Sequence, residues 1–422
     1  MEAKPNGYLS ELKNELLKGV VVPELSGFRE QCIYKVPPRL RQVNPEAYTP
    51  QVISIGPFHR SHGDNILHQM EPLKLNYLKG FLNRTKLSLD DFDFDSQEWE
   101  NRIRSCYGGL FSFNSNEFLK IIIVDACFII EHFLRFYEYS NWERNDPILL
   151  QPWLLDDIKR DLVLLENQLP FFVLEYIYRL AGLNRGSPSF FDITSIYFQP
   201  MDRNLHNLTS HRMLSPYHFT DLVRAFLLPS SFFVHETGCS IENVYSVSQL
   251  SEAGLVCEVN EGKYLLDLSF DEGVLKMPCL HVHHTTESYL RNILAYEECH
   301  ISNLNTRYIS QYLTILGFLI NSEKDVSILI DKKIIVNWMG DANDVATMVN
   351  NLRKNVSMPP FRLQYKSVCE RLNGFYENPM NKHKAILVHE YFNTPWKIAS
   401  TVAAVVLLLL TLIQTICSIV SL

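Results

Sequence analysis

IASTVAAVVLLLLTLIQTICSIVSL, the stretch from Ile398 to Leu422, carries no charged residue, no Pro and no Gly. A helix of this length is longer than the hydrocarbon core of a bilayer is thick, and its Ser, Thr and Gln side chains can bond within the helix or to a neighbour. Trp396 and Lys397 precede it, as an interfacial aromatic anchor and a cation reaching the headgroups would. We therefore predict a single membrane-spanning anchor that contacts lipid, rather than a buried core helix.

The residues before this stretch predict which side of the membrane the body faces. Residues 1–27 form a polar, amphipathic segment whose first apolar run is too short for a secretory signal. The cations near the predicted span, Lys382, Lys384 and Lys397, all lie on its N-terminal side. The positive-inside rule then places the body in the cytoplasm, at the plasma membrane or an endomembrane.

Composition agrees with this orientation and excludes one class of partner. Nine cysteines without a C-x-x-C pair predict reduced, buried thiols rather than a disulfide framework. Three N-x-S/T sequons, at Asn83, Asn207 and Asn355, matter only if the body faces the lumen or the cell exterior. A formal net charge of −8 argues against a nucleic-acid surface.

We expect residues 28–395 to form a globular body that is mainly α with a small β component (α+β). The clearest helical pattern covers residues 153–180, where Ile158, Leu162, Leu165 and Leu169 share one face. Pro170 interrupts this pattern because it removes a donor from the helix. Glu166, Asn167 and Gln168 lie at that break, and we expect their side chains to bond the backbone groups that it frees.

Two further predictions concern irregular structure. Residues 186–215 are rich in Ser, Pro, Asn and His, which predicts a long exposed loop. Residues 256–259 and 263–268 are predicted to be two strands around a turn at residues 260–262.

Candidate chemistry is sparse. Asp125 lies in an apolar helical run, where a carboxylate has to be paired or capped; a structural role is favoured there over a catalytic one. Cys279, His281 and His283 would share one face of a strand and are good Zn²⁺ ligands, but three alternate residues rarely complete a tetrahedral shell. We assign no catalytic residue, no metal and no cofactor, and whether this cysteine–histidine group binds a metal stays open.

Several motifs, taken in order, resemble a plant-specific family known as domain of unknown function 247. They are IYKVP at 33–37, YTP at 48–50, SIGPFH at 54–59, VDACFI at 124–129, DLVLLENQLP at 161–170, LSEAG at 250–254 and MPCL at 277–280. The resemblance implies a mainly helical, membrane-associated plant protein with a hydrophobic tail and no established enzymatic activity. Some grass members are associated with pollen–pistil self-incompatibility, a role that these motifs do not carry over.

Two functions follow from these observations. The favoured one is a membrane-anchored interaction or recognition protein, whose loops, above all residues 186–215, contact a protein partner. The alternative is an enzyme of another type at the membrane surface, using buried polar residues such as Asp125, Glu166 and His218. Convergence of these groups on one deep pocket would favour the enzyme, and local pairing of each would favour the interaction protein.

Overall fold

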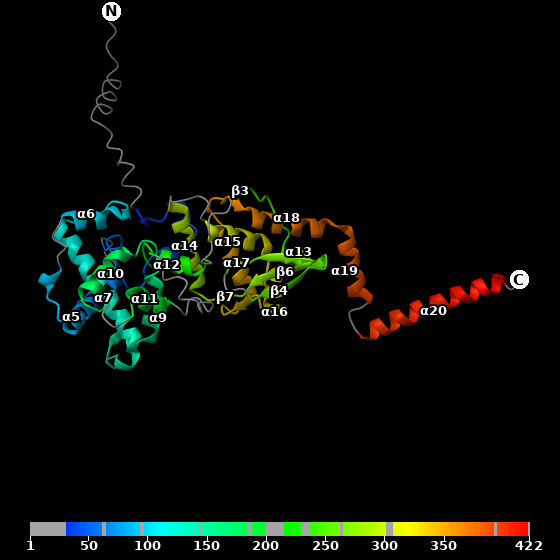
Figure 1. Ribbon diagram of the computed structural model, residues 1–422, viewed down its shortest axis with the longest axis horizontal. Coiled ribbons are helices and arrows are strands. Elements are labelled where there is room, and N and C mark those ends of the chain that lie inside the picture. Colours follow the sequence, from blue (N-terminus) through cyan, green and yellow to red (C-terminus); the bar gives the residue numbers. More distant parts are fainter. Residues whose placement is uncertain are drawn as a thin grey trace, which may run out of the picture. The chain divides into compact units, whose positions relative to one another are not determined.

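A computed structural model describes residues 31–60, 65–92, 97–142, 145–183, 188–198, 215–228, 237–261, 265–300, 307–391 and 395–420. Within these residues the protein is mainly helical, with one three-stranded and three two-stranded sheets, which confirms the predicted fold class. The amphipathic residues 1–27, Asn207 and Leu422 lie outside the described residues. Figure 1 labels the elements along the chain.

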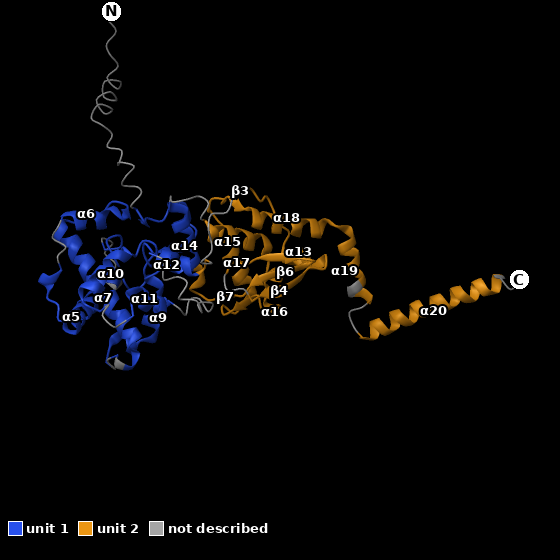
Figure 2. Ribbon diagram, in the orientation of Figure 1, with its two compact units in different colours: residues 1–226, 288–304 blue, residues 227–287, 305–422 orange. Residues whose placement is uncertain are grey.

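The chain divides into two compact units (Figure 2). Unit 1 comprises Met1–Phe226 and Ser288–Leu304, and unit 2 comprises Leu227–Glu287 and Asn305–Leu422.

Unit 1 is built around the helix α7 (Ser115–Tyr137). This helix begins with a capping box, in which Asn114 accepts a bond from the Glu117 N–H and Glu117 accepts one from the Asn114 N–H. Its middle is fully buried, and α5 (Glu71–Thr85), α10 (Phe171–Leu180) and α11 (Phe190–Phe198) pack against it. Phe133 of α7 stacks on Tyr197 of α11 with ring centroids 4.2 Å apart. Aromatic packing of this kind holds the helices together.

The other elements of unit 1 surround this core. Two short strands, β1 (Ile33–Tyr34) and β2 (Tyr107–Gly108), pair in parallel. The remaining helices are α3 (Pro38–Arg41), η1 (Pro45–Tyr48), α4 (Asn65–Gln69), η2 (Leu89–Asp91), α6 (Gln97–Ser105), η3 (Tyr139–Asn141), α8 (Pro147–Leu150), α9 (Pro152–Asp161), α12 (Phe219–Phe226) and most of α14 (Thr286–Cys299).

Two predictions about unit 1 are wrong. The periodic residues Leu162, Leu165 and Leu169 are buried as expected, but α9 ends at Asp161 and residues 162–170 are ordered without being helical. The predicted loop at residues 186–215 contains α11, whose Phe190 and Tyr197 lie in the core, so the prediction is wrong at residues 190–198; residues 186–187 and 199–214 lie outside the described residues. Burial of its aromatic side chains outweighs the loop-like composition of the residues around this helix.

Unit 2 contains the other sheets. In one, β6 (Val274–Pro278) lies between β4 (Val256–Asn260), which is parallel to it, and β5 (Ser269–Asp271), which is antiparallel. Residues 256–259 form β4 as predicted, but residues 265–268 are not a strand and the partner of β4 is β6; residues 262–264 lie outside the described residues. The tight turn of this sheet is at Gly273, between β5 and β6. The other pairs are β3 (Thr237–Cys239) with β9 (Phe361–Arg362), and β7 (Leu280–Val282) with β8 (Ile335–Asn337). The helices are α13 (Val247–Glu252), α15 (Tyr308–Leu319), α16 (Glu323–Asp331), α17 (Ala342–Leu352), α18 (Leu363–Glu377) and α19 (Pro379–Tyr391).

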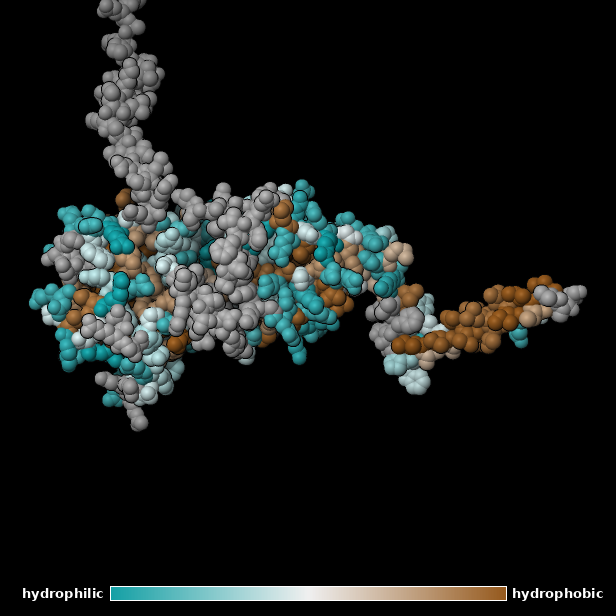
Figure 3. All heavy atoms as spheres, viewed as in Figure 1, coloured by the Kyte–Doolittle hydropathy of each residue, from teal (hydrophilic) through white to brown (hydrophobic). Residues whose placement is uncertain are grey.

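The final helix, α20 (Pro395–Val420), differs from every helix packed in the two units. It is long and apolar enough to cross a membrane, with a mean hydropathy of 2.5, and no residue in its most apolar window is buried. Hydrophobic side chains cover it along its length (Figure 3). Trp396, at its start, is 85% exposed.

Candidate functional site

The chain at residues 51–58 forms neither helix nor strand and is held by side chains. Asp161 accepts bonds from the N–H groups of Gln51, Val52 and Ile53 at 2.8–3.0 Å. The side chain of Asn167 accepts from Ile55 N–H at 2.6 Å and donates to Ile53 O at 2.9 Å. Buried backbone groups need hydrogen-bond partners, and these two side chains provide the bonds that a neighbouring strand would provide in a sheet. Burial raises the pKa of Asp161 to about 6 despite these bonds.

Asp125 of α7 fixes the end of the same segment. Its carboxylate accepts the Gly56 N–H at 2.9 Å, Lys74 Nζ at 2.8 Å and Arg60 Nη2 at 2.6 Å. Asp125 and Lys74 are both fully buried, and Lys74 also bonds Ser54 O and Glu71. Burial tends to raise the pKa of Glu71, but Lys74 and Arg60 outweigh it, so that pKa is lowered. The group is a closed ion network in which each charge has an opposite charge beside it.

Glu166 and Gln168 connect the neighbouring chain segments. Glu166 accepts the Val36 N–H at 2.6 Å and lies 2.8 Å from Arg41 Nη2 and 3.4 Å from His59 Nε2. Gln168 donates to Leu162 O and Leu164 O, and it accepts the N–H of Phe219 at 2.9 Å.

These contacts place the residues singled out from the sequence within one buried network. Pro170 then stands directly before α10. Its N-terminal position costs the helix no donor.

His218 is buried separately in unit 1. Its Nε2 lies 2.9 Å from Cys32 O, and its Nδ1 accepts the Asp221 N–H at 3.3 Å. Burial lowers the pKa of this histidine to about 4, so the ring is neutral at pH 7 with its proton on Nε2. Both ring nitrogens are used within the fold.

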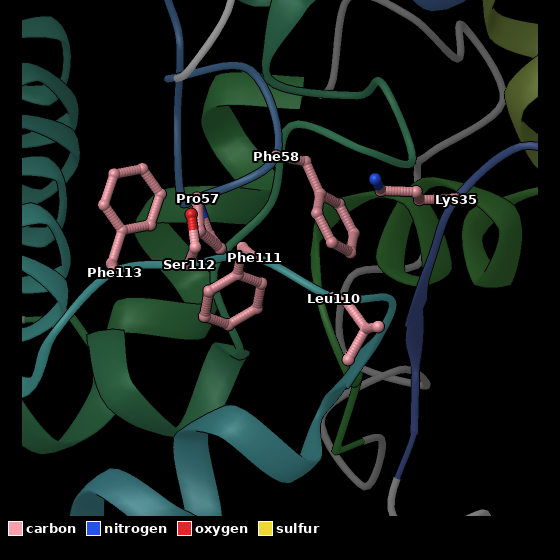
Figure 4. A pocket seen from close by; sticks show the side chains of 7 residues that line it. All are labelled: Lys35, Pro57, Phe58, Leu110, Phe111, Ser112 and Phe113. Atoms are coloured by element: carbon pink, nitrogen blue, oxygen red, sulfur yellow. The ribbon is translucent and has the colours of Figure 1, made fainter.

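A pocket of about 340 Å³ lies where the strands β1 and β2 end (Figure 4). Because the strands are parallel, the residues that follow them meet at one edge: Lys35 follows β1, and Leu110, Phe111, Ser112 and Phe113 come shortly after β2. Pro57 and Phe58, which follow Gly56, complete the lining.

Aromatic rings and one cationic side chain line the pocket. Phe58 meets Phe111 edge to face at 6.1 Å, and Lys35 Nζ lies 5.4 Å from the centre of the Phe58 ring. Figure 4 shows the lysine amine beside that ring. Leu110 is 96% exposed at the rim. These groups suit an apolar or aromatic side chain that carries a negative charge nearby.

Sequence reasoning missed this pocket. The signals for it, Pro57-Phe58 and Phe111-Ser112-Phe113, are 53 or more residues apart and become neighbours only in the folded chain, where Asp125 and Asn167 fix the segment before Pro57. Each is too short to predict a site alone.

The cysteine–histidine group of unit 2 has other contacts. His281 lies within β7 opposite Val336, and the His283 ring stacks on Trp338 with centroids 5.5 Å apart. The His283 N–H donates to Thr286 Oγ1 at 2.9 Å. Among the described residues, no three His, Cys, Asp or Glu side chains are grouped so as to hold a metal ion, and Cys279 belongs to no such group.

Comparison with known proteins gives a family match over most of the chain. A family model described as a plant protein of unknown function, domain of unknown function 247, matches residues 33–410. UPF0481 protein At3g47200 of Arabidopsis thaliana is 28% identical, over 98% of this chain and 92% of that protein. Putative UPF0481 protein At3g02645 of the same plant is 24% identical, over 90% and 89%. No solved structure matches.

Proposed function

The chain belongs to the plant family of domain of unknown function 247, and we propose that it is a membrane-anchored interaction protein. In this proposal α20 crosses the bilayer once, the body faces the cytoplasm, and the pocket beside β1 and β2 binds a segment of a protein partner.

The observation that carries the proposal is the local pairing of the buried polar groups. Asp125, Glu166 and His218 each bond backbone groups or charges close by. None of these three lines the pocket of unit 1. An enzyme would need acid, base or nucleophile side chains directed at a shared space, and local pairing supports the interaction protein instead.

The lining of the pocket suggests the chemistry of the partner. The rings of Phe58 and Phe111 provide an apolar surface, Leu110 extends it at the rim, and Lys35 supplies a positive charge. A peptide with an aromatic or branched aliphatic side chain next to a carboxylate complements all four residues. The anchored backbone of the walls, bonded through Gly56 and Val36, keeps the pocket formed before the partner arrives.

The positions of three lysines support the orientation, and two exposed asparagines allow it to be tested. Lys382, Lys384 and Lys397 lie before the span, on the side of the body. Asn83 on α5 and Asn355 after α17 are exposed sequon residues, so sugar on either would be visible if the body entered the secretory lumen. Protease digestion of intact membranes should cleave the body and find both asparagines bare; protection together with glycosylation would contradict the orientation.

The pocket is tested by photo-crosslinking in plant cells. A crosslinking residue replaces Leu110 in one variant and Leu150, which is 64% exposed at the end of α8, in the matched control. We expect a discrete adduct from position 110 that Lys35→Glu reduces at least tenfold, and none of the same mass from position 150. Equal adducts at both positions, or an adduct insensitive to Lys35→Glu, would rule out this pocket.

A further inference from the structure

Two cysteines stand at matching positions just before the strands that carry the pocket. In the register of β1 and β2, Ile33 pairs with Tyr107. Cys32 directly precedes Ile33, and Cys106 directly precedes Tyr107. The Cys32 N–H and the Ile33 N–H both donate to Cys106 O at 2.9 Å. The two cysteine backbones are therefore held side by side.

The thiols also lie near each other, because the Cys106 thiol acts on the pKa of Cys32. The Cys106 thiol itself donates to Arg102 O at 3.3 Å. Neighbouring strands are about 4.8 Å apart, within the range of about 4.4–6.8 Å that Cα atoms of disulfide-bonded cysteines show. Both residues are buried and both are free thiols in this structure.

We infer that Cys32 and Cys106 are a disulfide-forming pair that closes by exchange with a small disulfide such as oxidised glutathione, linking β1 covalently to β2. The inference does not depend on the proposed function. It differs from the expectation, drawn from the spacing of the cysteines in the sequence, that the thiols have no disulfide framework.

The exchange balances in two steps. The Cys106 thiolate, the more exposed of the two, attacks one sulfur of oxidised glutathione, forming a mixed disulfide and releasing one glutathione thiolate. The Cys32 thiolate then attacks the Cys106 sulfur and releases the second glutathione. Two protein thiols are oxidised, one glutathione disulfide is reduced to two thiols, and the two protons pass to the released thiolates.

The surroundings set the speed of closure. The Cys106 thiol and burial both raise the pKa of Cys32 well above its usual value, which keeps this thiol protonated at neutral pH. Since the thiolate is the reacting form, we expect closure over hours in the folded protein and faster closure during folding. The site is thus suited to a lasting cross-link rather than to rapid sensing.

The bond would fix the walls of the pocket. The chain between the two cysteines forms a loop of about 75 residues, and cross-links that close long loops restrict the unfolded chain most. Lys35 leaves β1 and Leu110 follows β2, so the link would hold the two sides of the pocket at a constant separation.

The test uses the full-length protein in detergent micelles, incubated for a day in glutathione buffers from fully reduced to fully oxidised. Samples are quenched with acid, alkylated under denaturing conditions, digested and analysed by mass spectrometry. We expect the linked Cys32–Cys106 peptide to exceed every other cysteine pair at least tenfold. The oxidised protein should melt about 5 °C or more above the reduced one.

Two control variants distinguish the Cys32–Cys106 disulfide from unspecific oxidation of cysteines. Cys106→Ala should abolish the linked peptide and the shift in melting temperature, whereas Cys257→Ala, at a buried cysteine of unit 2, should change neither. If Cys32 and Cys106 are both alkylated at the most oxidising ratio, even after refolding in that buffer, the inference is wrong. Preferential pairing of either residue with another cysteine would also overturn it.

Discussion

The helices α7 and α20 both contain long apolar runs, yet their side chains have opposite surroundings. In α7, Phe118, Ile122 and Phe128 are fully buried. In α20, Leu408 and Ile419 are 71% and 68% exposed. A soluble protein buries such side chains, and no other described part of this chain covers the most apolar window of α20, which favours the proposed membrane span.

Their ionisable residues explain the difference. Asp125, Glu131 and His132 interrupt the apolar run of α7, and each has a partner on another element: Asp125 bonds Lys74, Glu131 bonds Arg84, and His132 lies 3.0 Å from Tyr197 Oη. After Lys397, α20 contains no Asp, Glu, Lys, Arg or His. Apolar length alone therefore does not separate the two kinds of helix; paired charged residues mark a core helix such as α7, and their absence marks a candidate span such as α20.

Among the substitutions that test this difference between α7 and α20, Asp125→Ala is expected to have the largest effect on stability. Asp125→Ala leaves the buried Lys74 without its buried counter-charge and the Gly56 N–H without an acceptor. We expect the free energy of unfolding of the body to fall by about 3–5 kcal/mol, measured by denaturant titration. Lys120→Ala, at an exposed position of the same helix, should change it by less than about 0.5 kcal/mol. A similar loss in both variants would show that the ion network is not what places α7 in the core.

A smaller loss of stability is expected at Gly56, whose N–H donates to Asp125. Gly56 and Gly182 both have positive φ, 69° and 68°, but a Cβ at Gly56 would lie 2.6 Å from Gln168 O, whereas one at Gly182 meets nothing within 4 Å. Gly182→Ala should cost about 1–2 kcal/mol from backbone strain alone. Gly56→Ala should cost about 1–3 kcal/mol more, because the clash is with backbone. Equal losses in thermal or denaturant unfolding would remove the close approach as the reason for this glycine.

Over a single pH unit, the smallest effect is a pH dependence that α7 has and α20 lacks. Burial lowers the pKa of His132 to about 3, below its ordinary value of 6.5. As the pH falls through that window, the unfolded chain binds a proton that the folded chain does not, so stability decreases by about 1.4 kcal/mol per pH unit. Asp146 and Arg135, which act on this histidine, are retained when only His132 is changed.

The corresponding variant is His132→Gln. The slope of unfolding free energy against pH, measured between pH 6 and 4, should be smaller than in the parent by about 1.4 kcal/mol per pH unit. This difference corresponds to one proton. An unchanged slope would contradict this, because it would mean that His132 takes up its proton at the same pH in the folded and the unfolded chain.

Some of this fold was predictable because its causes are local. The apolar positions 158, 162, 165 and 169 predicted burial correctly, and the charge-free C-terminal run predicted the long apolar helix. The end of α9 at Asp161 was not predictable from periodicity. It depends on backbone donors at Gln51 to Ile53, some 110 residues away, which that carboxylate accepts.

The pocket was hidden for a related reason. The part of its lining that follows β1 and β2 depends on the register between these strands, which have two residues each and are too short to leave a pattern in the sequence. Residues 190–198 were predicted as loop because Ser, Pro and Asn surround them, whereas Phe133 and Phe171 in the core provide the packing that makes them a helix. In both regions the structure depends on contacts between residues far apart in the sequence.

The most direct test of the account is whether α20, and nothing else in the chain, holds the protein in a membrane. Membranes containing the full-length protein are extracted with alkaline carbonate and floated on a density gradient, beside the variants Leu408→Arg/Leu409→Arg and Leu408→Ala/Leu409→Ala. Each arginine at the centre of a span costs about 2.5–3.5 kcal/mol of insertion. We expect the parent and the alanine variant to float with the lipid and the arginine variant to be released with its body folded. Release of the parent, or flotation of all three proteins alike, would contradict it.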